Sequence, residues 1–297
     1  LYVGPGAVAG VGVHQAHRAQ GAKPHGVGTA GSHDLDGHAA LVHGHGIGLF
    51  AVGYQRGCKP AGEDKGGCLS WSEMEIIRST IQEIKTKCRW CVVVAHGGEE
   101  FTAIPSPYTR ERYHAYLEMG ADLVVCHHPH VPMNYETVGD KMIFYSLGNF
   151  IFDTDYQRAQ FNTEKGILLK LHFTEDRYSF EAFGLKINRE NEHIESAPLP
   201  KIFVDIQEDD YNKLEPLAAK MFLAATKRQQ LFLYPDKFKN ATEAQWKAHF
   251  YEEKRSGRVP GEALDFQIIY PIAQEEAKGA WKECKLEAVK AYILEQM

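Results

Sequence analysis

The sequence lacks a long apolar run and an excess of positive charge. Without about 18 consecutive apolar residues, it predicts no membrane-spanning helix. The formal net charge of −6 argues against nucleic acid as a partner, because no basic surface is indicated. The chain begins at Leu1 without a basic and then apolar leader, so we expect the natural start, with any signal or anchor, to lie upstream.

Cysteine is scarce, and the spacing of the six cysteines indicates no disulfide framework. Cys88 and Cys91 form a CxxC motif, which redox and zinc sites use. The chain has no second CxxC, and Cys91 leads directly into an apolar run. We therefore favour two reduced cysteines beside a strand over a redox or zinc site.

Acidic residues are almost absent from residues 1–57, where only Asp34 and Asp36 occur. The same segment holds 14 of the 27 glycines and 7 of the 15 histidines, and only residues 47–52 are patterned like a strand. Such a composition buries too little apolar surface to offset the entropy of ordering. The segment could be a histidine-rich metal-scavenging tail, a corrupted stretch of coding sequence or an unusual part of the domain. The abrupt change near Cys58 favours the second interpretation.

From residue 70 onward the pattern is that of an α/β protein. A capping box is predicted at residues 72–75, followed by a helix whose apolar residues fall on one face. A second helix is predicted at residues 109–119, ending at Gly120. The predicted strands cover residues 92–95, 123–126, 134–138, 141–147, 166–173 and 178–187, with a hairpin turn at 139–140. Residues 205–231, 242–256 and 281–294 are predicted to be surface helices.

Polar side chains follow three of these strands at the point where each ends. The three groups are His96 with Glu99 and Glu100, His127 with His128 and His130, and Asn149 after Gly148. Strand ends in open α/β folds face a crevice in which ligands bind. Imidazole and carboxylate groups together suit a divalent metal such as Zn²⁺ or Mn²⁺. The clustering therefore predicts a metal site at this edge of the sheet.

Other interpretations of these residues stay open. A single histidine at a strand end is usually a hydrogen-bonded structural residue, and Asn149 is of a type that commonly forms turns. The spacing does not distinguish Glu99 from Glu100 as the ligand. Arg110 and Arg112 could bind an anion in the crevice, although arginine is common on helix surfaces.

Three long motifs, in order and at matching spacing, resemble the bacterial CapA family of capsule and poly-γ-glutamate biosynthesis proteins. They are the run from His96 to Glu100, the run from Gly120 to Val131 and the run from Ile143 to Asp153. The resemblance covers about residues 70–190. It implies a metallophosphatase-like β-sandwich flanked by helices, with the metal site at the strand ends. By the register of the motif, it also implies Glu100 rather than Glu99 as the carboxylate.

The resemblance further implies roles for individual residues. His96, His128 and His130 are expected to hold a divalent metal ion, with Mn, Zn or Fe as candidates. Glu100 would orient a ligand or assist proton transfer, and Asn149 would help to position the substrate. The family carries further metal motifs upstream, and the only echo of them is Ser32 to Asp36, with His33 and Asp36 as the equivalents.

These observations predict an α/β protein with three parts. Residues 1–57 form the atypical Gly/His-rich segment, residues 58–195 the CapA-like metallophosphatase core, and residues 196–297 a mainly helical C-terminal appendage. The expected function is capsule or poly-γ-glutamate biosynthesis with a metal-dependent phosphoesterase-type site. Two alternatives are a non-catalytic component that binds polymer or assists assembly, and a soluble metallophosphoesterase for small molecules.

The resemblance also implies partners and a location. The expected partners are an anionic polymer or phosphoester substrate and a capsule or polyglutamate synthase complex. Family members are expected outside the cytoplasmic membrane and often attached to it, although no signal or anchor is visible in this sequence.

Overall fold

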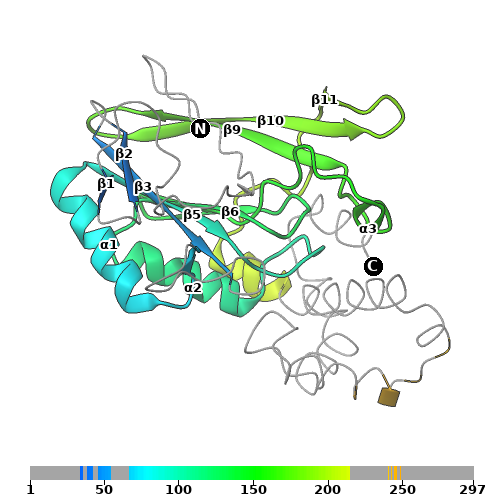
Figure 1. Cartoon of the computed structure of the whole chain (residues 1–297), viewed down its shortest axis with the longest axis horizontal. Helices are drawn as coiled ribbons and strands as arrows, with labels where there is room; N and C mark the ends of the chain where they lie inside the picture. The colour runs from blue at the N-terminus through cyan, green and yellow to red at the C-terminus, as the bar shows by residue number, and fades with distance from the viewer. Residues whose placement is uncertain are drawn as a thin grey trace.

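A computed structural model describes residues 34–35, 39–42, 46–54 and 67–214, together with residues 240, 242, 244–245 and 248. Its strands form a sheet of eight and a sheet of three (Figure 1). The strands of the large sheet are β1 (Asp34–Leu35), β2 (Ala39–Val42), β3 (Ile47–Gly53), β4 (Leu69–Ser70), β5 (Trp90–His96), β6 (Leu123–His127), β7 (Tyr135–Val138) and β8 (Lys141–Phe144). The small sheet contains β9 (Lys165–Phe173), β10 (Tyr178–Asn188) and β11 (His193–Ala197).

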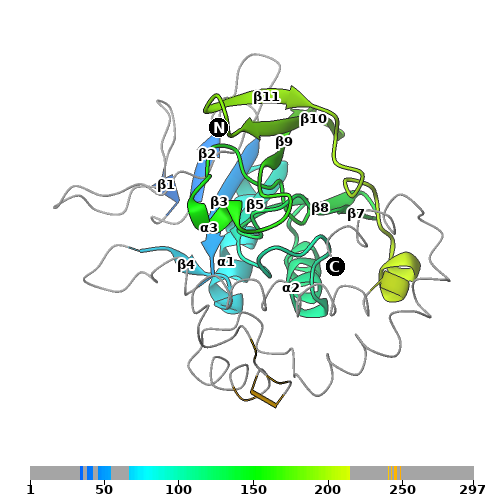
Figure 2. The ribbon, with the colours of Figure 1, turned by 90° about the vertical axis from the view of Figure 1, so that its right-hand side faces the viewer.

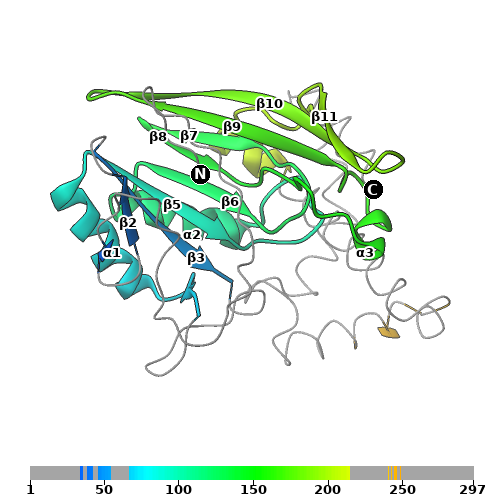
Figure 3. The same ribbon diagram turned by 45° about the horizontal axis from the view of Figure 1, so that its top comes forward.

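The large sheet has a parallel centre. Its order is β1-β2-β3-β5-β6-β8-β7, with β4 paired to β3, and neighbouring strands from β3 to β8 run parallel. The helices α1 (Met74–Lys87) and α2 (Pro107–Glu118) connect these strands and cover one face of the sheet (Figure 2). The small antiparallel sheet lies over the opposite face (Figure 3). The molecule is therefore layered as helices, large sheet and small sheet.

Alternating side chains of the central strands build the two interfaces between these layers, because successive strand residues point to opposite faces. In β5, Val93 belongs to the cluster that contains Ile81 of α1 and Tyr113 of α2. Its neighbour Val92 belongs to the other cluster, with Leu169 of β9. Strands covered on both faces read as continuous apolar runs, which is why β5 and β6 could be predicted from sequence.

Helix α1 follows the predicted apolar pattern but not the predicted start. Ile77, Ile81 and Ile84 are fully buried, which confirms the face. The capping box is wrong, because the N-cap is Glu73 and no side chain caps it. Ser72 instead shares a hydrogen bond of 2.8 Å between its hydroxyl and that of Ser70.

Helix α2 begins two residues before the predicted position. Ser106 is its N-cap and accepts a hydrogen bond from the backbone amide of Thr109. Pro107 is the first helical residue, where proline is favoured because its missing N–H would have no partner there. The predicted end is confirmed, since Gly120 follows the C-cap residue Met119 with φ of +116°.

The remaining predicted strands and the hairpin are confirmed, with ends shifted by a few residues. The short helix α3 (Asp155–Arg158) and the edge strand β11 were not predicted. A mixed α/β architecture with two sheets is thus established for the described part of the chain.

The domain boundaries stay predictions, although the structure bears on both ends of the core. Strand β3, within the atypical segment, pairs with β5 along its whole length. Beyond residue 195, Tyr135 bridges to Asp205, and the helical residues 208–214 include Tyr211, whose hydroxyl donates to the carbonyl of Pro105. The predicted helices at 242–256 and 281–294 lie mostly or wholly outside the described residues. None of the helices in the described segments is long and apolar enough to cross a membrane.

Candidate metal centre

The ends of β5 and β6 bring the histidine motifs together. The two strands are parallel, and their last residues, His96 and His127, are partners in the register. The chain beyond each strand end therefore enters the same region, as expected for an open parallel sheet. The ring centroids of His96 and His128 lie 5.0 Å apart.

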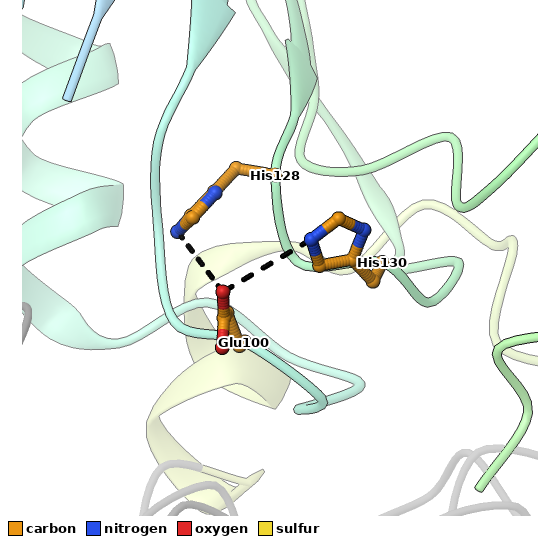
Figure 4. A group of neighbouring side chains, drawn as sticks. All are labelled: Glu100, His128 and His130. Carbon is orange, nitrogen blue, oxygen red and sulfur yellow. Dashed lines mark ion pairs between the residues drawn. The ribbon is translucent and has the colours of Figure 1, made fainter. Parts of the chain in front are cut away.

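Glu100, His128 and His130 form the centre of this region (Figure 4). One ligand atom from each side chain lies within 4.8 Å of the others. The Oε1 atom of Glu100 is 3.9 Å from Nε2 of His128 and 4.0 Å from Nε2 of His130. These gaps exceed hydrogen-bond length but are close to the spacing of ligand atoms that share one ion, roughly 3 to 4 Å for ligand bonds of about 2.1 Å. The three residues could therefore hold a metal ion.

The imidazoles of this region are held in the neutral state. Burial lowers the pKa of His128 well below its usual value, and the nearby His96 and His130 lower it further. Burial also lowers the pKa of His130, and burial with the charge of His130 lowers that of His96 to about 4. At neutral pH the contacts to Glu100 are therefore not ion pairs. Neutral imidazole is the form that coordinates metals.

Two of the three residues have unusual backbone conformations. His128 has φ of +112° and His130 has φ of +61°, in a region that side chains other than glycine rarely adopt. Strain of this kind is typical of functional sites, where the surrounding structure holds a residue for its chemistry. Gly98, with φ of +116°, makes the corresponding sharp turn after β5.

The structure separates the two glutamates that spacing could not. Glu99 is buried, and its carboxylate accepts hydrogen bonds from the amide and hydroxyl of Ser106 and from the hydroxyl of Thr109. Glu99 thereby ties the loop to the start of α2. Glu100 lies on the side of His128 and His130.

The segment after β8 supports the centre through three side chains. The Oδ1 atom of Asn149 lies 2.9 Å from Nδ1 of His130, which leaves Nε2 of His130 on the side of Glu100. The ring of Phe152 stacks on His130 at 5.1 Å, and the hydroxyl of Tyr156 donates to the carboxylate of Glu100. Hydrogen bonds to the outer nitrogen of a ligand histidine fix its orientation.

Gly148 allows this segment to approach so closely. It has φ of +71°, and a Cβ atom there would lie 2.6 Å from the carbonyl oxygen of Lys165. A side chain at this position would therefore clash with the backbone next to Asn149.

The predicted site residues are distributed as follows. Glu100, His128 and His130 form the three-residue group, and Asn149 contacts it through His130. His96 is outside that group but lies against His128, and within the described residues its buried Nδ1 atom has no hydrogen-bond partner. His33 and Asp36 lie outside the described residues. The supporting residues Phe152 and Tyr156 were missed, because nothing local in the sequence indicates their contacts.

Arg110 and Arg112 are engaged elsewhere. The guanidinium of Arg110 makes an ion pair of 2.6 Å with Glu136, and that of Arg112 donates to the carbonyl oxygen of Trp71. The hypothesis that they bind an anion in the crevice therefore has no support in the geometry.

Residues 11–154 match the family described as "Bacterial capsule synthesis protein PGA_cap". Just under half of the chain therefore resembles this family. The matched range includes all three residues of the metal-binding group, and it ends beside Phe152.

Two curated relatives agree with this match. The "Capsule biosynthesis protein CapA" of Bacillus anthracis is 39% identical over 85 residues, which are 29% of this chain and 20% of that protein. The "PGA biosynthesis protein CapA" of Bacillus subtilis (strain 168) is 38% identical over 89 residues, which are 30% of this chain and 23% of that protein. The match thus spans about a fifth of the length of these relatives.

Proposed function

We propose that this chain acts in capsule or poly-γ-glutamate-type polymer production and carries a metal-dependent phosphoesterase-type site. The observation that supports this proposal is the group formed by Glu100, His128 and His130 at the ends of two parallel strands. The layered α/β architecture is compatible with the metallophosphatase-like β-sandwich that the motifs imply.

The residues divide into ligands and supports. Glu100, His128 and His130 would hold the ion, and His96 would complete the set, since its Nδ1 atom is buried without a partner in the described part of the chain. A bound divalent ion would polarise the ester and lower the pKa of a water to about 7. Asn149 holds the ring of His130 in place.

Metal content is the decisive measurement. Elemental analysis of purified protein should find about one or more equivalents of a transition metal, which the variant His128→Ala/His130→Ala loses. The matched control is His172→Ala/His193→Ala, which removes two surface histidines of the small sheet and should keep the metal.

A phosphodiesterase assay with bis(p-nitrophenyl) phosphate then tests the chemistry. Metal-dependent turnover that the His128→Ala/His130→Ala variant loses would support a hydrolase. Metal binding without turnover would favour the non-catalytic polymer-binding alternative. Equal metal content in the wild type and this variant would contradict the proposed site.

A further inference from the structure

Three consecutive large apolar side chains are exposed beside the candidate metal centre. Phe150, Ile151 and Phe152, here called the apolar rim, are 50%, 59% and 48% exposed. Contiguous exposed apolar groups of this kind usually mark an interaction site. Burial of apolar surface stabilises a protein by roughly 25 cal/mol for each Å² removed from water, and these side chains lack that stabilisation.

The apolar rim is attached to the metal centre at both ends. Asn149, directly before it, contacts Nδ1 of His130, and Phe152, its last residue, stacks on the same imidazole with ring planes 24° apart. Four residues span at most about 14 Å when extended, and the chain bends at Phe150 and Ile151. The side chains of the apolar rim therefore begin within a few ångströms of a proposed ligand.

Asp153, the charged residue directly after the apolar rim, is paired with two arginines. Asp153 accepts hydrogen bonds from Arg158 and from Arg189, both at 2.9 Å. Arg189 also lies 3.9 Å from Glu164. These four charges balance one another, so the apolar rim itself favours an apolar group over a charged one.

We infer that the site takes an amphipathic phosphoester whose phosphate is held at Glu100, His128 and His130 and whose apolar organic group rests on the apolar rim. This inference rests on the proposed function, since the metal centre supplies the attachment for the phosphate. The basis of the inference is that the apolar rim directly contacts His130, one of the proposed metal ligands.

The test compares two non-hydrolysable phosphonates that differ only in the length of the alkyl chain. Methylphosphonate and hexylphosphonate are titrated calorimetrically into the protein, with Mn²⁺ and again with EDTA. The variant Phe150→Ser/Ile151→Ser shortens the apolar rim but leaves Phe152 on His130. The matched control Leu168→Ser/Phe183→Ser removes a cross-strand pair that is 38% and 44% exposed on the small sheet.

In the wild type, hexylphosphonate should bind about 30-fold more tightly than methylphosphonate, which corresponds to two or three buried methylene groups. The Phe150→Ser/Ile151→Ser variant should reduce this ratio to about threefold without changing methylphosphonate binding. The control should keep the wild-type ratio.

Other outcomes overturn the inference or the proposed function separately. Equal affinity for both phosphonates in the wild type, with Mn²⁺ required for each, overturns the apolar rim and leaves the metal centre standing. A chain-length preference that EDTA does not alter supports the apolar rim and contradicts the metal centre. If sedimentation shows that the apolar rim holds two copies together, and the ratio is one, the surface is a dimer interface and the inference is wrong.

Discussion

Glu100 and Glu136 are both close to histidine nitrogens, but their surroundings differ. The carboxylate of Glu136 receives hydrogen bonds from Arg110 at 2.6 and 3.1 Å and from Tyr145 at 2.6 Å, and His114 lies 3.1 Å away. Glu100 instead lies 3.9 and 4.0 Å from its two histidine nitrogens. The first cluster is closed by direct contacts, and the second leaves a gap that suits an ion.

The pKa values of the titratable side chains also differ between the two clusters. Burial alone would raise the pKa of Glu136, but the contacts with His114, Arg110 and Tyr145 lower it to about 2. At the metal centre, burial lowers the pKa of the histidines instead. A charged, ion-paired cluster supports the fold, whereas neutral histidines are available to a ligand.

The largest expected effect is a difference in the free energy of unfolding between variants of the two glutamates. Glu136→Gln should lower the free energy of unfolding by about 3 kcal/mol, because it leaves the half-buried Arg110 without its counter-charge. The matched change Glu100→Gln should cost less than about 1 kcal/mol in EDTA. Urea unfolding of both variants checks this, and equal losses would contradict the contrast between the clusters.

The next effect is a pH dependence of the metal-free protein. His127 has a folded-state pKa of about 4, lowered by burial and then by His96, against an ordinary value of 6.5. The unfolded chain therefore binds the proton more readily as pH falls below 6.5, so stability is lost between pH 6.5 and 4. At pH 5 this one residue should account for about 2 kcal/mol.

Urea unfolding in EDTA at pH 7, 6 and 5 measures that slope. The variant His127→Gln should reduce it by the share of this residue, with the remainder due to the other buried histidines, whereas the surface variant His172→Gln should leave it unchanged. Identical slopes for wild type and His127→Gln would refute the assignment. Glu136 contributes in a lower window, since its stabilisation is present above about pH 4.5 and lost as pH falls towards 2.

The smallest expected effect concerns Tyr156. Tyr156→Phe removes the hydroxyl that donates to Glu100 and should weaken metal binding about tenfold, with little change in stability. Tyr178→Phe removes a hydroxyl that donates to the backbone carbonyls of Asp122 and Asp140, away from the site, and should leave metal affinity unchanged. Titration against a chelator of known affinity distinguishes the two, and equal affinities would exclude a positioning role for Tyr156.

Sequence patterns predicted the central elements because those elements are buried on both faces or on one regular face. The strands β5 and β6 are continuous apolar runs, and α1 has its isoleucines at helical spacing. Strand β11 escaped prediction because its residues are half-buried or exposed and do not alternate. The start of α2 was misplaced because proline is typical of loops, although Pro107 occupies the first helical position.

The candidate site was predictable where local motifs carry it and not where the fold does. His128 and His130 follow directly from one motif, and the choice of Glu100 needed the family register. The structural reason for that choice is that Ser106 donates a hydrogen bond to the carboxylate of Glu99. Ser106 lies seven residues away, at the start of α2, so the spacing of the motif does not show this contact. The contacts of Tyr156 and Phe152 depend on the chain returning past β6 after the hairpin, which no short pattern encodes.

The three residues of the metal-binding group lie in the segments that directly follow β5 and β6, on either side of α2 in the chain. Glu100 precedes the crossover helix, and His128 follows it. Metal binding there would join the two ends of a loop of about 28 residues, and a link of that length restricts the unfolded chain much as a disulfide does. The crossover would then be the part of the molecule most resistant to opening in the presence of metal, and hydrogen exchange would slow first in α2.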